Sequence, residues 1–158
     1  MAVQLIQNGG FESGTLRPGW RQTPGSAALY GCVTDAVRSS GSYCLELRGM
    51  DFVEQTFTAV VARATGPLTF RIKAASALAA GPFFVRIEYT DGTADVPFLG
   101  SVTTRWTSKS FTVDGVKRLK RIQFGTGETD SVYVDDVSLV GSRTLLVRRP
   151  RRAAAAKK

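Results

Sequence analysis

The stretch FFVRIEY at residues 83–89, followed by TDGT at 90–93 and ADVPF at 94–98, indicates the fold class of this chain. Successive side chains of a strand point to opposite faces, so Phe83, Val85, Ile87 and Tyr89 share one face while Arg86 and Glu88 share the other. The pair at 91–92 is Asp-Gly, a turn signal whose glycine accepts a positive φ without steric cost. The stretch therefore predicts a β-hairpin with one buried face.

Similar short runs rich in Val, Ile, Phe, Tyr and Thr extend in both directions from this hairpin. The one stretch with helical composition, 74–80, is bounded by Gly-Pro and is expected to be a loop or short turn. So many short strands predict an all-β sandwich or barrel. The expected strands are about 3–7, 20–23, 27–34, 42–48, 52–60, 67–75, 82–89, 94–98, 106–113, 119–124 and 131–140.

The composition excludes several kinds of catalytic site. The chain has 158 residues, enough for one domain with a real core, and it has no histidine and two cysteines. A Ser-His-Asp group, a histidine-ligated metal and a four-cysteine cluster are therefore excluded within one chain. Asp135 and Asp136 are neighbours on an expected strand and should point to opposite faces, so they are not expected to form a catalytic dyad. We predict a protein that is not an enzyme.

Positive charge is concentrated at the C-terminus. The chain has 21 Lys and Arg against 13 Asp and Glu, but seven bases and no acid follow Asp136, which leaves 14 bases and 13 acids in residues 1–142. We expect a β domain at 1–142 and an extended basic tail at 143–158. A near-neutral body argues against a nucleic-acid-binding face on the domain. No apolar run approaches the roughly 20 residues of a membrane helix, and no secretory leader is recognisable at the start.

Six motifs occur in a characteristic order along the chain. They are NGGFESG at 8–14, PGW at 18–20, VTD at 33–35, SGSYCLEL at 40–47, WTSKSFT at 106–112 and VYVDDVSL at 132–139. In this order and at these spacings, the chain resembles carbohydrate-binding modules of families four, nine and twenty-two. The resemblance covers about residues 4–140 and implies a galactose-binding-like jelly-roll β-sandwich.

The same resemblance implies a structural calcium site that joins the first and last strands. Calcium takes six to eight oxygen ligands from carboxylates and carbonyls, which suits the residues implied. The alternative is that Glu12 accepts hydrogen bonds from loop amides and that the aspartate pair ends a strand. The implied ligands are Glu12, Asp135 and Asp136 through their carboxylates and Gly10 and Ser40 through neutral oxygens.

Cys32 and Cys44 flank a loop and could face each other across two antiparallel strands. This requires Val33 to pair with Tyr43 and Thr34 with Ser42. A non-hydrogen-bonded pair then brings the two Cα atoms to about 4.5 Å, which a disulfide can span. The alternative is two thiols, as in a reducing compartment.

Few aromatic residues are available to stack on a sugar. Both tryptophans fall in motifs that the resembled families use in the core, and two tyrosines belong to shared motifs. Phe83 and Phe84 also remain, but most of these aromatics alternate along strands and are expected in the core. The residues assigned to ligand binding are Tyr30, Tyr89 and Phe98.

The tail suggests contact with partner proteins, because an apolar run is embedded in arginines that suit acidic surfaces. We therefore expect a structural or decoration protein of a large assembly, a phage virion being the main candidate. The alternatives are a polysaccharide-binding module of a secreted hydrolase, which would be extracellular, and phosphate contact through the tail. The partner-binding residues expected are Leu145, Leu146, Val147, Arg148, Arg149, Arg151 and Arg152.

Overall fold

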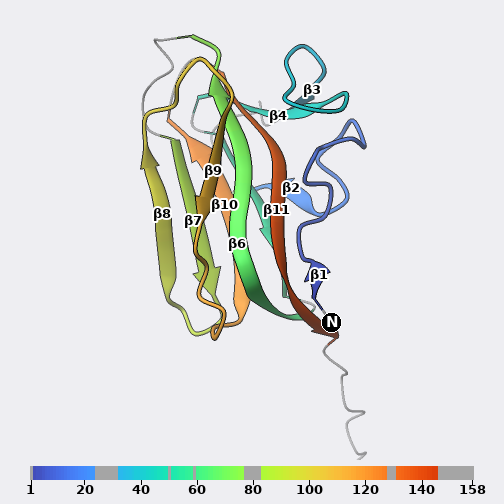
Figure 1. The fold of residues 1–158 in the computed structure, drawn as a ribbon, viewed down its shortest axis with the longest axis vertical. Helices are drawn as coiled ribbons and strands as arrows, with labels where there is room; N and C mark the ends of the chain where they lie inside the picture. Colours follow the sequence, from blue (N-terminus) through green and yellow to red (C-terminus); the bar gives the residue numbers. More distant parts are fainter. Residues whose placement is uncertain are drawn as a thin grey trace, which may run out of the picture.

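The structure is a computed structural model that describes residues 2–23, 32–49, 51–58, 60–76, 83–127 and 131–145. These residues form β-strands and connections (Figure 1), and no helix long and apolar enough to cross a membrane occurs among them. The strands are β1 (Val3–Gln4), β2 (Trp20–Gln22), β3 (Cys32–Thr34), β4 (Cys44–Leu47), β5 (Asp51–Thr56), β6 (Val60–Ala74), β7 (Phe83–Tyr89), β8 (Ala94–Gly100), β9 (Thr107–Phe111), β10 (Leu119–Thr126) and β11 (Val132–Leu145).

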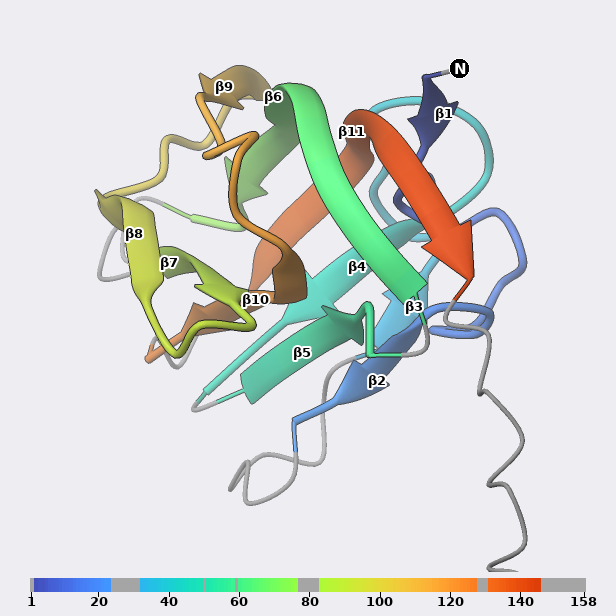
Figure 2. The same ribbon diagram turned by 90° about the horizontal axis from the view of Figure 1, so that it is seen from below.

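The strands form two antiparallel sheets that pack face to face, as Figure 2 shows from below. One sheet has the order β3-β4-β11-β6-β9, with β1 added beside β11. The other has five strands in the order β2-β5-β10-β7-β8. The expected all-β jelly-roll sandwich is confirmed, and Pro97 lies on the edge strand β8, a position that tolerates proline.

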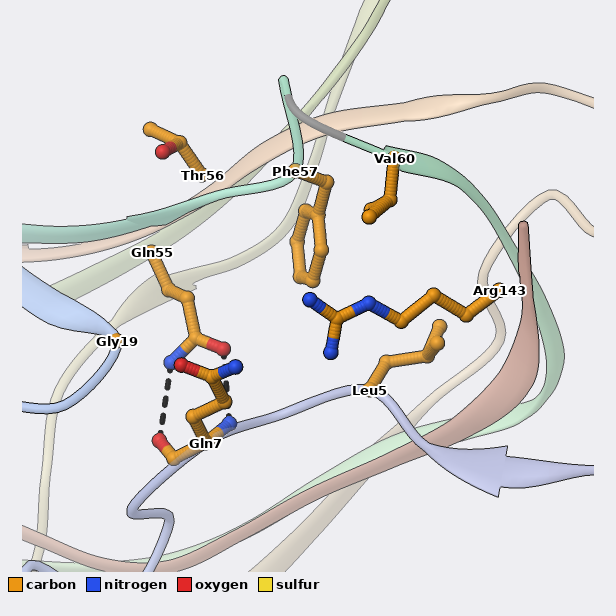
Figure 3. A pocket seen from close by; sticks show the side chains of 8 residues that line it. All are labelled: Leu5, Gln7, Gly19, Gln55, Thr56, Phe57, Val60 and Arg143. Carbon is orange, nitrogen blue, oxygen red and sulfur yellow. Dashed lines mark hydrogen bonds between the residues drawn. The ribbon is translucent and has the colours of Figure 1, made fainter. Parts of the chain in front are cut away.

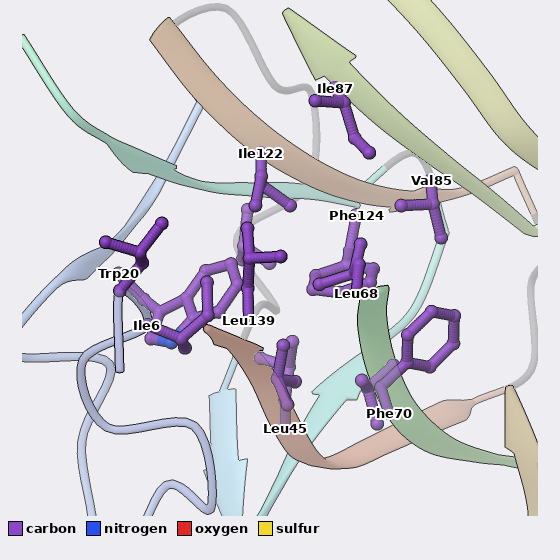
Figure 4. Packing of buried hydrophobic residues seen from close by; sticks show 14 of the residues in the cluster. Ile6, Trp20, Leu45, Leu68, Phe70, Val85, Ile87, Ile122, Phe124 and Leu139 are labelled. Atoms are coloured by element: carbon purple, nitrogen blue, oxygen red, sulfur yellow. The ribbon is translucent and has the colours of Figure 1, made fainter. Parts of the chain in front are cut away.

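Apolar side chains from the two inner faces form a single core (Figure 4). Trp20, Ile122 and Phe124 come from the five-stranded sheet, while Phe70 and Leu139 come from the other sheet. The rings of Phe70 and Phe124 meet edge to face at 5.2 Å, an arrangement that adds to the burial energy of the two side chains. The core therefore fixes which residues of each strand point outward.

The 83–98 hairpin has the predicted alternation, since Phe83, Val85, Ile87 and Tyr89 are fully buried. Several other strand boundaries differ from the prediction, and the differences around β5 and β6 have a visible cause. The expected strand 52–60 is two elements, because β5 ends at Thr56 and a turn closed by the Val60 N–H to Phe57 carbonyl bond starts β6. This turn has neither Gly nor Pro to mark it. Conversely, β6 continues through Gly66-Pro67, where a bulge opposite Val140 lets the proline stay in the sheet.

The longest strands, β6 and β11, pair along almost their whole length, from Val132 opposite Ala74 to Leu145 opposite Val60. β11 therefore runs past the composition change at residues 141–142. β1 pairs with the same end of β11, with Val3 opposite Gly141. The N-terminal strand and the end of β11 consequently lie at one end of the sandwich (Figure 1).

Candidate functional site

The residues implied as calcium ligands do come together, around the loop at 39–43. Both carboxylate oxygens of Glu12 accept the Ser42 N–H at 3.0 Å, and one accepts the Tyr43 N–H at 3.1 Å. Asp135 Oδ2 accepts the Ser39 and Ser40 N–H groups at 3.0 and 3.1 Å. Gly10 lies in the loop that carries Glu12. The carboxylates thus tie the loop to the N-terminal segment and to β11.

Asp135 and Asp136 do not diverge as expected. Asp136 has a φ of 53° and sits in a bulge of β11, which interrupts the alternation of the strand. As a result Asp136 accepts hydrogen bonds from the hydroxyls of Ser39 and Ser40, the same two residues that bind Asp135. The prediction of opposite faces is therefore wrong. Asp135 is fully buried, and this burial raises the pKa of its carboxyl.

These carboxylates do not fit a calcium ion as they are arranged. Their oxygens accept N–H and O–H donors of the loop in place of a shared cation. The part of the chain that the structure describes contains no group of three Asp, Glu, Cys or His residues able to hold a metal. The geometry matches the first part of the alternative, since Glu12 binds loop amides, but the aspartate pair lies inside β11 and does not end a strand. Calcium remains a prediction from the resemblance.

The predicted register between the two cysteine strands is wrong by two residues. Thr34, not Cys32, lies opposite Cys44, and Cys32 lies opposite Glu46. Cys44 is fully buried, and its thiol donates to the Val37 carbonyl at 2.6 Å. The cross-strand pair on which the Cys32–Cys44 disulfide was predicted does not exist; the side chain of Cys32 is outside the described part. The loop between the strands is longer than the sequence suggested, because residues 35–43 fold over the aspartates.

Two of the three aromatics assigned to ligand binding are described: Tyr89 belongs to the core, and Phe98 packs against it. Tyr89 is fully buried, donates to Asp95 Oδ2 at 2.7 Å and accepts the Asp114 N–H at 3.2 Å. Its assignment as a ligand platform is therefore wrong. Phe98 is half-buried and packs on Phe83 and Phe111, with ring centroids 6.0 and 5.9 Å away.

The other assigned residues are at or beyond the limits of the described structure. Tyr30 lies outside it. Of the tail residues, Leu145 ends β11, and its side chain is not described. Leu146 to Arg152 lie outside the described residues, so their role in binding a partner stays a prediction.

The outer face of the five-stranded sheet carries a pair of rings that the ligand assignment missed. Val53, Phe124 and Val85 point into the core, so their neighbours Phe52, Gly125 and Phe84 point outward in one row across three strands. The two phenylalanines are half-buried, and their ring centroids are 5.4 Å apart. A Cβ on Gly125 would collide with both rings. The missing side chain thus lets the two rings meet above the sheet.

An ionic network occupies the next outward rows of the same face. Arg21 donates to Glu54 Oε1 through Nε at 3.0 Å and Nη2 at 2.7 Å. Arg121 bridges both acids, with Nη1 on Glu54 at 2.8 Å and Nη2 on Glu88 at 2.6 Å. Arg86 donates to Glu88 at 3.0 Å. Aromatic rings and fixed polar groups therefore lie side by side on one sheet surface.

The acids at the centre of the network are buried, whereas the arginines at its margins are exposed to solvent. The side chains of Glu54 and Glu88 are 1% and 10% exposed, whereas those of Arg21 and Arg86 are 58% and 44% exposed. The pKa of Glu88 is lowered, mainly by the hydrogen bond from Arg121. Desolvation opposes this shift, and the charges of the nearby cations add to it. The same hydrogen bond raises the pKa of Arg121. The carboxylate of Glu88 is therefore stabilised in its ionised form, and both acids lie beneath exposed guanidinium groups.

A part of this face could be found in the sequence. The alternation at 83–89 places Phe84 with Arg86 and Glu88, away from the buried residues. The same period places Phe52 with Glu54. What the sequence does not contain is the strand order, which puts β10 between β5 and β7 and so brings Gly125 between the two rings.

A small pocket lies at the end of the sandwich where β5 turns into β6 (Figure 3). Its volume is about 120 Å³, below the roughly 300 Å³ at which ligand pockets begin. The Gln55 amide on its wall binds the Gln7 backbone at 2.8 and 3.0 Å. Arg143 extends across the pocket between Phe57 and Leu5. The pocket can hold a few water molecules and is not the stronger candidate site.

Comparison with known proteins identifies the fold. No family model matches the chain, and no curated protein matches it. Solved structures do match. A variant of a family 29 carbohydrate-binding module aligns over 90% of this chain and 91% of its own, with a TM-score of 0.56 at 17% identity. The chain has the fold of a carbohydrate-binding module.

Two further modules show the same architecture. A family 61 module in complex with β-1,4-galactotriose covers 87% of this chain and 97% of its own, with a TM-score of 0.55 at 19% identity. A xylanase from Clostridium thermocellum, solved with a family 22 module and xylohexaose, covers 87% of this chain but 28% of its own, with a TM-score of 0.61 at 14% identity. At these identities the likeness shows the fold alone.

Proposed function

We propose that this protein is a non-catalytic glycan-binding module, and that it binds its glycan on the outer face of the five-stranded sheet. The observation that carries the proposal is the row Phe52–Gly125–Phe84, where two half-buried rings on the outer face meet above a glycine. A sugar ring has an apolar C–H face that stacks on such rings and hydroxyl groups that bind polar neighbours. The row of Glu54, Gln123 and Arg86 beside the rings supplies those neighbours.

The fold supports this proposal, because the aligned structures include modules solved with mannohexaose, β-1,4-galactotriose and xylohexaose. The face is also preorganised. Gln123 donates to Thr23 at 2.9 Å, and the arginines are held by the acids, so little side-chain freedom remains to be lost on binding. An anchoring role in a virion or another assembly rests on the tail and stays a prediction beside this proposal.

Calorimetry with mannohexaose, β-1,4-galactotriose and xylohexaose, and affinity gels with polysaccharides, test the proposal. Phe84→Ala should weaken the binding of any bound glycan by about tenfold or more, since truncating a contacting phenylalanine removes about 1.5–3 kcal/mol of apolar contact. Tyr133→Ala is the matched control, because Tyr133 is a half-buried aromatic on the outer face of the other sheet.

Both variants should keep the thermal unfolding transition of a folded domain. Equal binding by Phe84→Ala and the parent protein would contradict the proposed face. If binding falls in Tyr133→Ala instead, the glycan site belongs to the other sheet.

A further inference from the structure

We propose that the glycan is acidic, and that its carboxylate or sulfate groups bind Arg21 and Arg86, which lie in the row next to the ring pair. This inference rests on the proposed function, since it names the ligand class of the same face. It starts from an excess of positive charge. Among the described residues of this network, four cations surround two carboxylates. The cations are Arg21, Arg86, Lys120 and Arg121, and the carboxylates are Glu54 and Glu88.

The excess is local to this face. Residues 1–142 as a whole are almost neutral, with 14 bases against 13 acids. Arg121 alone contacts both carboxylates, with one Nη nitrogen on each. Two positive charges suffice to neutralise the two acids, so two of the four are in excess. An anionic ligand would balance them.

Arg21 and Arg86 have unused donors that face solvent. A guanidinium carries five N–H groups. Arg21 uses Nε and Nη2, and Arg86 uses Nε, so Arg21 Nη1 and both Nη nitrogens of Arg86 have no partner within the described residues. Each guanidinium is held in place by its acid while its outer edge stays open. Such an edge fits a carboxylate or sulfate through charge-assisted hydrogen bonds.

The positions of the two arginines match a ligand that lies along the rings. Arg21 and Arg86 belong to one row, in which Arg21 faces Glu54, Glu54 faces Gln123 and Gln123 faces Arg86. Three strand spacings separate them, which is about 14 Å. Arg86 follows Phe84 by two residues on β7, about 6.6 Å along the strand. A glycan stacked on Phe84 therefore brings its acidic substituents within reach of an arginine side chain.

A purely structural network is the competing explanation. In that case Arg21 and Arg86 only neutralise Glu54 and Glu88, and their replacement alters stability but not ligand choice. The two explanations differ in a measurable way, because only the ligand role makes binding depend on the charge of the glycan and on these two arginines together.

The experiment uses the full chain and matched pairs of polymers. Polygalacturonate is compared with its fully methyl-esterified form, dextran sulfate with dextran, and polyglutamate serves as an acidic polymer without sugar. Affinity gels and calorimetry at physiological salt are run on the parent, Arg21→Gln/Arg86→Gln and Phe84→Ala. The charge-matched control is Arg63→Gln/Arg105→Gln, which removes two exposed arginines that lie outside the network. All variants keep the same basic tail, so its contribution to binding cancels.

We expect one acidic polysaccharide to bind at least tenfold more tightly than its neutral counterpart. Arg21→Gln/Arg86→Gln should weaken this binding by about tenfold or more, and the control double variant by less than about twofold. Binding of polygalacturonate identifies a carboxylate ligand, and binding of dextran sulfate identifies a sulfate ligand. Should the double variant unfold, Arg86→Gln alone repeats the test, because Arg121 and Lys120 still pair Glu88.

Three results overturn the inference. The first is equal binding of the acidic and neutral forms, and the second is an equal effect of the two double variants. The third is polyglutamate binding that depends on Arg21 and Arg86 as strongly as glycan binding does. If neutral glycans bind and Phe84→Ala weakens them while the arginine variants do not, the proposed function stands and this inference fails. If no polymer responds to Phe84→Ala, the proposed function itself fails.

Discussion

Replacing Arg121 by glutamine should destabilise the domain by about 2 kcal/mol. Arg121 joins Glu54 and Glu88 at 2.8 and 2.6 Å, and a hydrogen bond to a charged group contributes about 1.5–3 kcal/mol. Breaking a fully buried pair would cost about 3–5 kcal/mol, but the Arg121 side chain is 29% exposed and both acids keep another cation, so the lower range applies. For a domain of this size the loss corresponds to a fall in Tm of about 4–8 °C.

Urea and thermal unfolding followed by tryptophan fluorescence measure this loss. Arg63→Gln, on an exposed position of β6, is the control for removal of one positive charge. A double-mutant cycle with Glu88→Gln isolates the pair, and the two changes should couple by about 1 kcal/mol or more. A loss below about 0.5 kcal/mol for Arg121→Gln, or one equal to that of Arg63→Gln, would refute the reasoning that Arg121 holds the network together.

Three other changes test separate parts of the structure. Tyr89→Phe should cost about 1 kcal/mol in urea unfolding, because the part-buried hydrogen bond to Asp95 at 2.7 Å is lost; an unchanged midpoint would contradict a stabilising role for this hydroxyl. Because the pKa of Glu88 is lowered in the folded state, its ionised carboxylate stabilises the domain above the unfolded-state pKa near 4.5. This contribution is lost as the pH falls through the folded-state pKa, and Glu88→Gln should flatten the dependence of stability on pH. Calcium should leave Tm unchanged relative to chelator, since Glu12 and Asp135 already accept loop N–H groups; a rise would show that the loop gives way to the ion.

The fold could be predicted from the sequence because it depends on local pattern. The alternation at 83–89 and the Asp-Gly turn define a hairpin without reference to the rest of the chain. The motif set then suggests the jelly roll. The predicted strand boundaries were wrong where Gly and Pro did not mark the turns. The turn at 57–60 contains neither residue, while Gly66-Pro67 lies inside β6 at a bulge.

The site could be predicted only in part because it depends on contacts across strands. The sequence brings Glu12, Ser40 and Asp135 to one loop through the motifs, yet it cannot show that Asp136 has a left-handed backbone that redirects its side chain. A register error of two residues was enough to pair the wrong partner with Cys44. Burial separates Tyr89 from Phe84, as the alternation at 83–89 indicates, although the ligand assignment included Tyr89 and omitted Phe84.

The pairing of β6 with β11 determines how the module would respond to mechanical load. The ring pair lies where β5 and β7 begin and β10 ends, whereas β11 ends at the opposite end of the sandwich, beside Val60. A pull between a ligand held at the rings and a tether beyond Leu145 acts along β11. The hydrogen bonds to β6 run across that direction and share the force in shear. β1, paired at two positions, would instead peel from its end one bond at a time. A tether from the C-terminal end is thus the stronger mechanical attachment.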